Sequence, residues 1–416
     1  MSNSVTFPPP LSSGHDTPGR PVAWSDPRRE AAFRGWLETI ATAHQLLPAS
    51  LRIASADASF RRYLRVDIAT TPGTSRIIMD APPEQEDCTA FVRVAGLMAA
   101  AGLNVPRILA WDQALGFMLL DDLGAHTMMD AVAPADPAAN LPLYLQAVDA
   151  LVAWQLASQP GVLPAYDAPL LMRELALFPD WYLAKHRGVA VEGELKATLD
   201  GIFQLVVERN LAVPNVYVHR DFMPRNLMMP RDVAPTLPTA CGSLALQAAA
   251  PPEAALLQAV QAGAGRLGAA ALSPEGATEI RLGVLDFQDA VYGPITYDIA
   301  SLMRDAFLSW DEDFVLDVTV RYWQNALKAG LPVDRDFGEF YRAVEWMGLQ
   351  RHLKVAGIFA RLTLRDGKPK YLADTPRFIA YIRATASRYR ELKPLLRLID
   401  KVEGSEAVSG FAYGRM

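Results

Sequence analysis

The chain has 416 residues, of which 51% are hydrophobic and 21% are charged. This composition is typical of a water-soluble globular protein, and the length is sufficient for one large core or for two lobes. The formal net charge of −6 argues against a general nucleic-acid binder, because such a protein presents a broad basic face.

Two cysteines, Cys88 and Cys241, lie far apart and lack the spacing of metal ligands, so we expect neither a disulfide framework nor a zinc site. No segment approaches the about 18 uninterrupted apolar residues of a membrane-spanning helix. The start of the chain lacks the basic and apolar regions of a secretory signal. We therefore expect a cytoplasmic protein that has no nucleic-acid, membrane or obligate protein partner.

The first part of the chain indicates a tail followed by a small mixed lobe. Residues 1–28 are rich in Pro, Ser and Gly and are expected to form a disordered tail. Residues 29–120 are expected to form an N-terminal nucleotide-binding lobe. Its predicted elements are a helix over 29–45, two strands within 51–67, a strand over 76–80, a helix over 88–103, and strands over 108–111 and 116–120. This order is that of an α+β lobe.

The remainder of the chain has mostly helical periodicity. Residues 121–124 (Asp-Asp-Leu-Gly) form a polar break that is expected to act as a hinge, and residues 125–416 are expected to form a helical C-terminal lobe. Helices are predicted over 141–157, 195–209, 297–307, 314–329, 337–364 and 378–392. Residues 230–281, rich in Ala, Pro and Gly, are interpreted as a surface insertion. The predicted fold class is α+β, a two-lobed protein-kinase-like fold with a small mixed N-lobe and a larger, mainly helical C-lobe.

The strongest motif lies at residues 219–226, which read His-Arg-Asp-Phe-Met-Pro-Arg-Asn and match the kinase catalytic-loop pattern H-R-D-x-x-x-x-N. In this pattern Asp221 is the catalytic carboxylate that accepts the proton of an attacking hydroxyl group. The amide oxygen of Asn226 can bind Mg²⁺. His219 is expected to be a buried residue that supports the loop.

A second motif follows at residues 282–289, which read Leu-Gly-Val-Leu-Asp-Phe-Gln-Asp. An apolar strand that ends in Asp286-Phe resembles the kinase D-F-G element, whose aspartate binds Mg²⁺. The two aspartates are 65 positions apart (286 − 221), and the insertion accounts for the excess over a compact hairpin. Alone, either motif could be an ordinary turn or strand end, but together and in this order they predict a site for ATP and Mg²⁺.

With these motifs the chain resembles the aminoglycoside phosphotransferase family of protein-kinase-like enzymes. More narrowly, it is similar to the anomeric N-acetylmuramate/N-acetylglucosamine kinases of bacterial cell-wall recycling. The residues that carry this similarity lie at 57–65, 79–84, 119–124, 219–226, 286–290 and 293–301. The resemblance covers about residues 29–392 without the insertion. It implies phosphorylation of the anomeric hydroxyl of either amino sugar to the α-1-phosphate, and it implies that Asp298 braces the catalytic loop.

The sequence departs from ordinary kinases in that no lysine occurs before Lys185. The usual phosphate-binding lysine of the third strand therefore has no candidate, and Asp80 takes its place in the alignment. An arginine of the second strand is expected to bind the ATP phosphates instead. Alternation along a strand puts Arg62 on one face and both Arg61 and Arg65 on the other. The sequence does not decide between the faces, and Arg62 is favoured over Arg65.

Other nucleotide contacts are expected from backbone groups. The turn that contains Ser59 has no glycine, but its small residues can let backbone N–H groups approach phosphate oxygens. The backbone of the hinge at Asp121 and Leu123 is expected to contact the adenine edge.

For the acceptor sugar, the candidates besides Asp221 are Trp181 as a stacking surface and the cations Arg304 and Arg351 for the lactyl carboxylate. Each also has a structural interpretation: Trp181 can be a core residue, and Arg304 can pair with a nearby aspartate.

Two further hypotheses stay open. One keeps the enzyme class but makes the acceptor an aminoglycoside, choline or another amine. The other is a nucleotide-binding pseudokinase scaffold, which the missing lysine favours. Against the scaffold stand Asp221, Asn226 and Asp286, because a protein without catalysis has no chemical need for all three.

Overall fold

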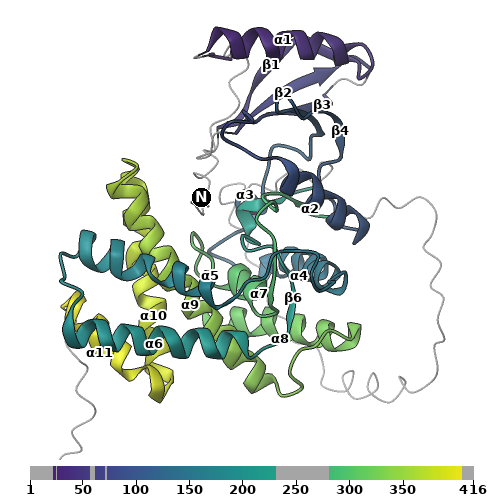
Figure 1. The fold of residues 1–416 in the computed structure, drawn as a ribbon. Helices are drawn as coiled ribbons and strands as arrows, with labels where there is room; N and C mark the ends of the chain where they lie inside the picture. The colour runs from purple at the N-terminus through teal and green to yellow at the C-terminus, as the bar shows by residue number, and fades with distance from the viewer. Residues whose placement is uncertain (1–21, 25, 57–60, 71–72, 231–280, 405–416) are drawn as a thin grey trace, which may run out of the picture. The chain divides into compact units, whose positions relative to one another are not determined.

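The computed structural model describes residues 22–24, 26–56, 61–70, 73–230 and 281–404 (Figure 1). All of these residues belong to one structural unit. Most of the expected tail, the turn at Ser59 and nearly all of the expected insertion lie outside the described residues.

The N-terminal part contains an antiparallel five-stranded sheet with the strand order β1-β2-β3-β5-β4. Its strands are β1 (Leu46–Ala56), β2 (Arg62–Ile68), β3 (Ser75–Asp80), β4 (Ile108–Asp112) and β5 (Phe117–Asp121). Arg62 pairs with Asp80 across the β2–β3 ladder, and Asp80 pairs with Phe117 across the β3–β5 ladder. The strands expected in this part are all present, although β1 begins earlier than expected.

The two faces of this sheet are covered by two different helices, α1 (Pro27–Ala41) and α2 (Thr89–Ala100) (Figure 1). On the α1 face, the buried side chains of alternate strand positions pack with Phe33, Trp36 and Leu37: these are Leu64, Val66, Ile78, Phe117 and Leu119. On the α2 face, the intervening residues Met79, Met118 and Leu120 join the large cluster that contains Phe91, Val94 and Met98 of α2. The alternation therefore assigns the buried hydrophobic residues of the strands to one of two distinct hydrophobic clusters.

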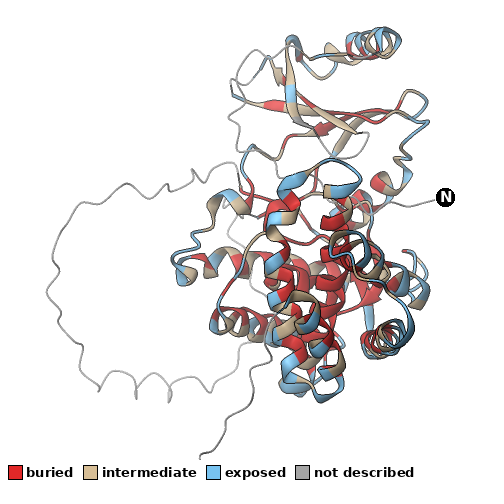
Figure 2. Ribbon diagram, turned by 90° about the vertical axis from the view of Figure 1, so that its left-hand side faces the viewer, coloured by how far each residue is buried: buried red, intermediate tan, exposed pale blue. Residues whose placement is uncertain are grey.

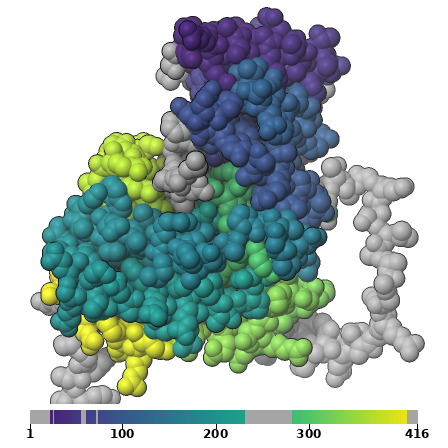
Figure 3. Space-filling model, in the orientation of Figure 1, coloured from purple at the N-terminus to yellow at the C-terminus, as the bar shows by residue number. Residues whose placement is uncertain are grey.

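The rest of the chain is mainly helical. Its α-helices are α3 (Met128–Ala131), α4 (Leu141–Leu156), α5 (Ala168–Leu175), α6 (Gly193–Leu211), α7 (Tyr297–Met303), α8 (Glu312–Ala329), α9 (Phe337–Leu364), α10 (Thr375–Arg388) and α11 (Lys393–Glu403). A π-helix, η2, spans Phe178–His186. Two small antiparallel pairs join β6 (Asn215–Val218) to β9 (Val291–Pro294) and β7 (Leu227–Met228) to β8 (Gly283–Val284). In Figure 3 the teal residues, which include η2 and α6, form much of the surface of this part that is turned to the viewer.

Helix α9 is the central element of this part, because its side chains are buried almost without interruption from Val344 to Leu362. Figure 2 shows that the buried residues gather in the interior of the helical part. At Gly357 the helix approaches the start of η2 so closely that an added Cβ would lie 2.3 Å from the carbonyl carbon and oxygen of Leu177. Glycine at this position is therefore required by the packing of α9 against η2.

Most differences between the expected and observed elements have local causes. Helix α1 begins at Pro27, inside the expected tail, because the Asp26 carboxylate accepts the Arg28 amide at 2.8 Å and caps the helix. Helix α7 ends at Met303 rather than at residue 307, and Asp305 there accepts the Phe307 and Leu308 amides. The π-helix, the helices α3, α5 and α11, and the strands β6, β7 and β9 were not predicted, whereas β8 lies within the apolar strand expected before Asp286. Strands of two to four residues are too short to show a periodicity.

Candidate active site

The catalytic-loop motif follows β6, and its backbone is hydrogen-bonded to a side chain of α7. The buried Asp298 carboxylate of α7 accepts the His219 amide at 2.7 Å and the Arg220 amide at 3.0 Å. Burial raises the pKa of Asp298 to about 7, although both amides favour its ionised form. The expectation that Asp298 braces this loop is confirmed.

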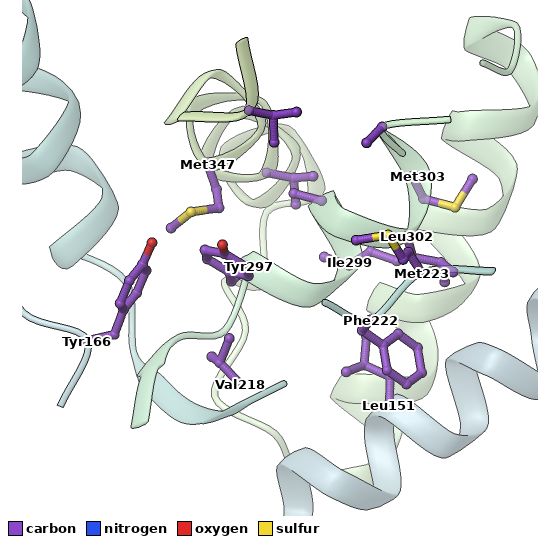
Figure 4. Packing of buried hydrophobic residues seen from close by; sticks show 14 of the residues in the cluster. Leu151, Tyr166, Val218, Phe222, Met223, Tyr297, Ile299, Leu302, Met303 and Met347 are labelled. Atoms are coloured by element: carbon purple, nitrogen blue, oxygen red, sulfur yellow. The ribbon is translucent and has the colours of Figure 1, made fainter. Parts of the chain in front are cut away.

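Apolar residues between the motif positions hold the loop in place. Phe222 and Met223 are both buried in the large hydrophobic cluster. Figure 4 shows them together with Leu151 of α4 and Leu302 of α7. Burial of these two side chains fixes the loop that carries Asp221.

His219 is a supporting residue, as expected. Its side chain is fully buried, and its Nε2 atom lies 3.0 Å from the Leu285 carbonyl oxygen. The Asp221 amide donates to His219 Nδ1 at 3.2 Å. Burial lowers the pKa of His219 to about 4, so the ring is neutral near pH 7. It links the two motifs rather than transferring a proton.

Two residues of these motifs have a left-handed backbone: Arg220 with φ of 78° and Asp286 with φ of 64°. This conformation is costly for residues with a side chain and concentrates at functional sites. At Arg220 it is held by a buried ion pair, in which Nη2 donates to Glu174 Oε1 at 2.6 Å. Lys354 lies 2.9 Å from the same oxygen. Burial opposes ionisation of Glu174, but the charges of Lys354 and Arg220 hold its pKa at about 2.

The three predicted catalytic and metal residues come together. Asn226 donates through Nδ2 to the Asp221 carbonyl oxygen at 2.9 Å and to Asp286 Oδ2 at 3.2 Å. This orientation leaves the Asn226 amide oxygen to face a cation. Within the described residues, the buried Asp221 Oδ1 accepts no hydrogen bond. The arrangement can therefore offer one carboxylate to an acceptor hydroxyl and a second, with an amide oxygen, to a metal ion.

These oxygen ligands fit Mg²⁺, which is usually held by one or two carboxylates together with substrate phosphates rather than by a cage of protein side chains. The described part of the chain has no group of three or more His, Cys, Asp or Glu side chains that could hold a metal ion by itself.

The predicted hinge begins inside β5. The Asp121 amide donates to the Arg107 carbonyl at 3.0 Å, and the Asp121 carboxylate accepts Arg107 Nε at 2.5 Å. The amide and the carboxylate of Asp121 are therefore both engaged by Arg107 of the neighbouring segment. By contrast, no hydrogen bond engages the Leu123 backbone within the described residues.

Arg65 lies beside this hinge. Its Nε donates to Asp122 at 2.7 Å, and its Nη2 donates to the Gly124 carbonyl at 2.9 Å. Ser75 also donates to Asp122, at 2.5 Å. Although burial opposes it, the charge of Arg65 and the bonds from Ser75 and Gly124 lower the pKa of Asp122. The contacts of Arg65 thus hold the hinge, and Asp122, which the sequence analysis did not single out, is their common acceptor.

Arg62 lies on the α1 face of the sheet. Its Nη2 is 2.5 Å from Asp80 Oδ2, and its guanidinium lies 4.1 Å from the centre of the Trp24 ring. Arg29 of α1 binds the other oxygen of Asp80 at 2.6 Å. Asp80 orients Arg62, but on the face of the sheet that is opposite to α2.

The predicted sugar-binding residues have separate surroundings. Arg351 is buried, and its Nη1 donates to the Arg220 carbonyl at 2.8 Å, so it contacts the catalytic loop. Arg304 binds Glu312 at 3.0 Å rather than the nearby Asp305 or Asp298. Trp181 lies in η2 under Lys185.

Trp181 and Lys185 form a cation–π interaction, in which Lys185 Nζ lies 3.6 Å from the centre of the Trp181 ring. Of the three candidates, only Arg351 has a hydrogen bond to the catalytic loop among the described residues. The loop contact that the sequence missed altogether is Glu174, which lies 46 positions before Arg220 and belongs to no local motif.

The profile of the phosphotransferase enzyme family (APH) matches residues 50–235 and 277–337. The chain belongs to this family. Two relatives cover most of its length. The N-acetylmuramate/N-acetylglucosamine kinase of Pseudomonas aeruginosa is 45% identical over 361 residues, which are 86% of this chain and 91% of that protein. The enzyme of the same name from Neisseria meningitidis serogroup B is 40% identical over 388 residues, which are 93% of this chain and 100% of that protein.

Solved structures place this phosphotransferase among protein-kinase-like folds. A choline kinase from Cryptosporidium parvum superimposes with a TM-score of 0.51 at 11% identity, over 88% of this chain and 99% of that chain. At this identity the likeness concerns the fold alone. The expected α+β fold, with a sheet in the N-terminal part and a mainly helical remainder, is confirmed. In the described part of this phosphotransferase, no helix is both long and apolar enough to cross a bilayer.

Proposed function

We propose that this phosphotransferase transfers the γ-phosphoryl group of ATP to the anomeric hydroxyl of N-acetylmuramate or N-acetylglucosamine, giving the α-1-phosphate and ADP. The observation that carries the proposal is the hydrogen-bonded arrangement of Asp221, Asn226 and Asp286. The choice of sugar rests on the relatives named for these two substrates. The reaction would serve peptidoglycan recycling in the cytoplasm.

In the proposed reaction, Asp221 accepts the proton of the anomeric hydroxyl while a new bond forms between that oxygen and the γ-phosphorus. The bond from this phosphorus to the β,γ-bridging oxygen breaks, and ADP leaves. An anomeric hydroxyl is more acidic than an ordinary alcohol, so modest base assistance suffices. Asn226 Oδ1 and the Asp286 carboxylate would hold Mg²⁺, which neutralises charge on the phosphates.

The nucleotide base is proposed to lie against the hinge, where the Leu123 backbone offers an N–H and a carbonyl that no other described group uses. Ser59 stays a prediction for the phosphates. On the acceptor side, Arg351 is proposed to act through the catalytic loop that it contacts. Trp181 and Arg304 stay predictions for the sugar. The contact of Trp181 is with Lys185 of the same helix, η2, and that of Arg304 is with Glu312, so neither contact connects the residue to the catalytic loop.

An ADP-release assay with MgATP and a panel of acceptors tests the proposal. The panel contains N-acetylmuramate, N-acetylglucosamine, glucosamine, choline and an aminoglycoside, and phosphorus NMR locates the product phosphate. We expect an α-1-phosphate on one or both N-acetylated sugars. Asp221→Asn is expected to abolish turnover while it binds MgATP as the wild type does, because the carboxylate contacts the acceptor rather than the nucleotide.

The other outcomes discriminate between the alternatives. Turnover on choline or an aminoglycoside alone would support the phosphotransferase activity but exclude the amino sugar as the acceptor. Bound ATP with no turnover on any acceptor would favour the scaffold. Full activity in Asp221→Asn would end the assignment of the catalytic residue.

A further inference from the structure

The phosphates of ATP need a cation from the N-terminal sheet, and the chain has no lysine before Lys185 to provide it. Arg61 and Arg62 are adjacent and follow the turn between β1 and β2, but strand alternation turns their side chains to opposite faces. The packing of the two faces therefore decides which arginine can meet a nucleotide.

The α2 face of the sheet adjoins the metal-binding segment. Phe91 of α2 lies 4.9 Å from Phe287, measured between ring centres, and Phe287 directly follows Asp286. Close by, the Val284 amide donates to the Asn104 carbonyl at 2.8 Å. A nucleotide whose phosphates reach the Asp286 carboxylate must therefore lie on the α2 side.

Arg61 lies on that side. Its Nε atom is 3.6 Å from Glu86, in the segment that leads into α2, and its side chain is 13% exposed. Tyr63, two positions along β2, packs against the same cluster as α2, which confirms the parity. Arg62 lies on the other face, where Asp80 binds it together with Arg29.

Arg65 shares the face of Arg61 but is held elsewhere. Its guanidinium binds the hinge at Asp122 and Gly124, so moving it to a phosphate would remove the charged partner of a buried carboxylate. The ion pair of Arg61 is different. Glu86, which lies 3.6 Å from Arg61 Nε, belongs to the segment that leads into α2, so this ion pair holds Arg61 on the α2 side of the sheet and does not engage the hinge.

We infer that Arg61 binds the phosphates of the nucleotide, in place of the missing lysine, and that Glu86 is the positioning residue that orients it. The planar guanidinium can bind two phosphate oxygens at once, which a lysine cannot do. This inference rests on the proposed ATP-dependent function. It assigns phosphate binding to Arg61 rather than to Arg62, its neighbour in the sequence.

The test compares Arg61→Ala with Arg62→Ala, a matched pair that removes the same side chain from opposite faces of the sheet. Binding of MgATP and of adenosine is measured without acceptor by intrinsic tryptophan fluorescence or calorimetry. For Arg61→Ala we expect MgATP affinity to fall about tenfold or more, as for loss of a charge-assisted contact, while adenosine affinity stays within about twofold. Unchanged adenosine binding also shows that the variant is folded.

Arg62→Ala is expected to keep the wild-type ratio of MgATP to adenosine affinity. Arg61→Lys should recover part of the MgATP affinity, and Glu86→Gln should weaken it less than Arg61→Ala does. A selective loss of MgATP affinity in Arg62→Ala, or its absence in Arg61→Ala, would overturn the inference while leaving the proposed function intact. If the wild type bound no ATP, the proposed function itself would fail.

Discussion

Replacement of Gly357 by alanine tests the packing of the central helix. Gly357 lies in the interior of α9, where alanine is normally the better helix former by about 1 kcal/mol. The added methyl group, however, would lie 2.3 Å from the carbonyl carbon and oxygen of Leu177 and 2.7 Å from its Cβ. Contacts this short do not occur between real side-chain and backbone atoms, so α9 and the start of η2 must separate.

The magnitude follows from two opposing effects. Overpacking a tight interface costs about 1–3 kcal/mol, and the upper end applies because the obstacle is backbone rather than the tip of a flexible side chain. The helix propensity of alanine offsets about 1 kcal/mol of this. We therefore expect Gly357→Ala to lower the free energy of unfolding by about 2 kcal/mol. Gly201→Ala in α6 is the matched control, because nothing lies within 4 Å of its added methyl group.

Urea unfolding, followed by circular dichroism and tryptophan fluorescence, measures both variants. Gly201→Ala should raise the free energy of unfolding by about 0.5–1 kcal/mol and should therefore unfold at a higher urea concentration than the wild type. Gly357→Ala should unfold at a lower one. It should also reduce turnover, because the same helix carries Arg351, which contacts the catalytic loop. A Gly357→Ala protein as stable as Gly201→Ala would refute the close approach of α9 and η2.

Three further predictions concern charged and polar side chains. Asp122→Ala leaves the partly buried Arg65 without its carboxylate, so we expect a loss of about 1–3 kcal/mol in the free energy of unfolding and a higher KM for ATP; an unchanged unfolding midpoint in urea would contradict the hinge contact. The pKa of Glu174 is about 2 in the folded protein, whereas its ordinary value is 4.5. Its ionised carboxylate therefore stabilises the fold by about 3 kcal/mol above pH 4.5, and this stabilisation is lost as the pH falls toward 2. Acid titration of the unfolding free energy should therefore be less steep in Glu174→Gln, and equal slopes would contradict the depressed pKa. Asn226→Ala removes the amide oxygen proposed for Mg²⁺ and should raise the Mg²⁺ concentration for half-maximal turnover about tenfold or more, whereas an unchanged Mg²⁺ dependence would remove it from the metal site.

Local motifs were sufficient to predict the centre of the site. Asp221, Asn226 and Asp286 were identified from short patterns, and the structure brings them within hydrogen-bonding contact through the Asn226 amide. Asp298 was expected to brace the loop and does so. Helix α9 has the expected bounds because its long hydrophobic pattern leaves little freedom in the choice of ends. Each motif is a short run of neighbouring residues and can be recognised without the fold, although the contacts between the motifs are long-range: Asp298 lies 79 positions from His219, whose amide it accepts.

The partners of charged side chains were not predictable in this way. The parity of Arg61 and Arg62 could be read from the sequence, but which face looks toward the Asp286 segment depends on where α1 and α2 pack. Arg65, a sequence candidate for the ATP phosphates, binds Asp122 and the Gly124 carbonyl of the hinge, which no local pattern predicted. The pairing of Arg220 with Glu174 joins positions 46 residues apart.

The sequence by itself thus determined the proposed chemistry of the site, because the residue types of the candidate catalytic motifs can be recognised within short stretches of the chain. Only the tertiary structure decided which cations are already bound to carboxylates and which side of the sheet adjoins the site. The physical reason is that burial brings together segments distant in the chain, and a buried charge must take its partner from whichever segment packs beside it. Asp80, Asp122 and Glu174 each meet such a partner only in the folded protein.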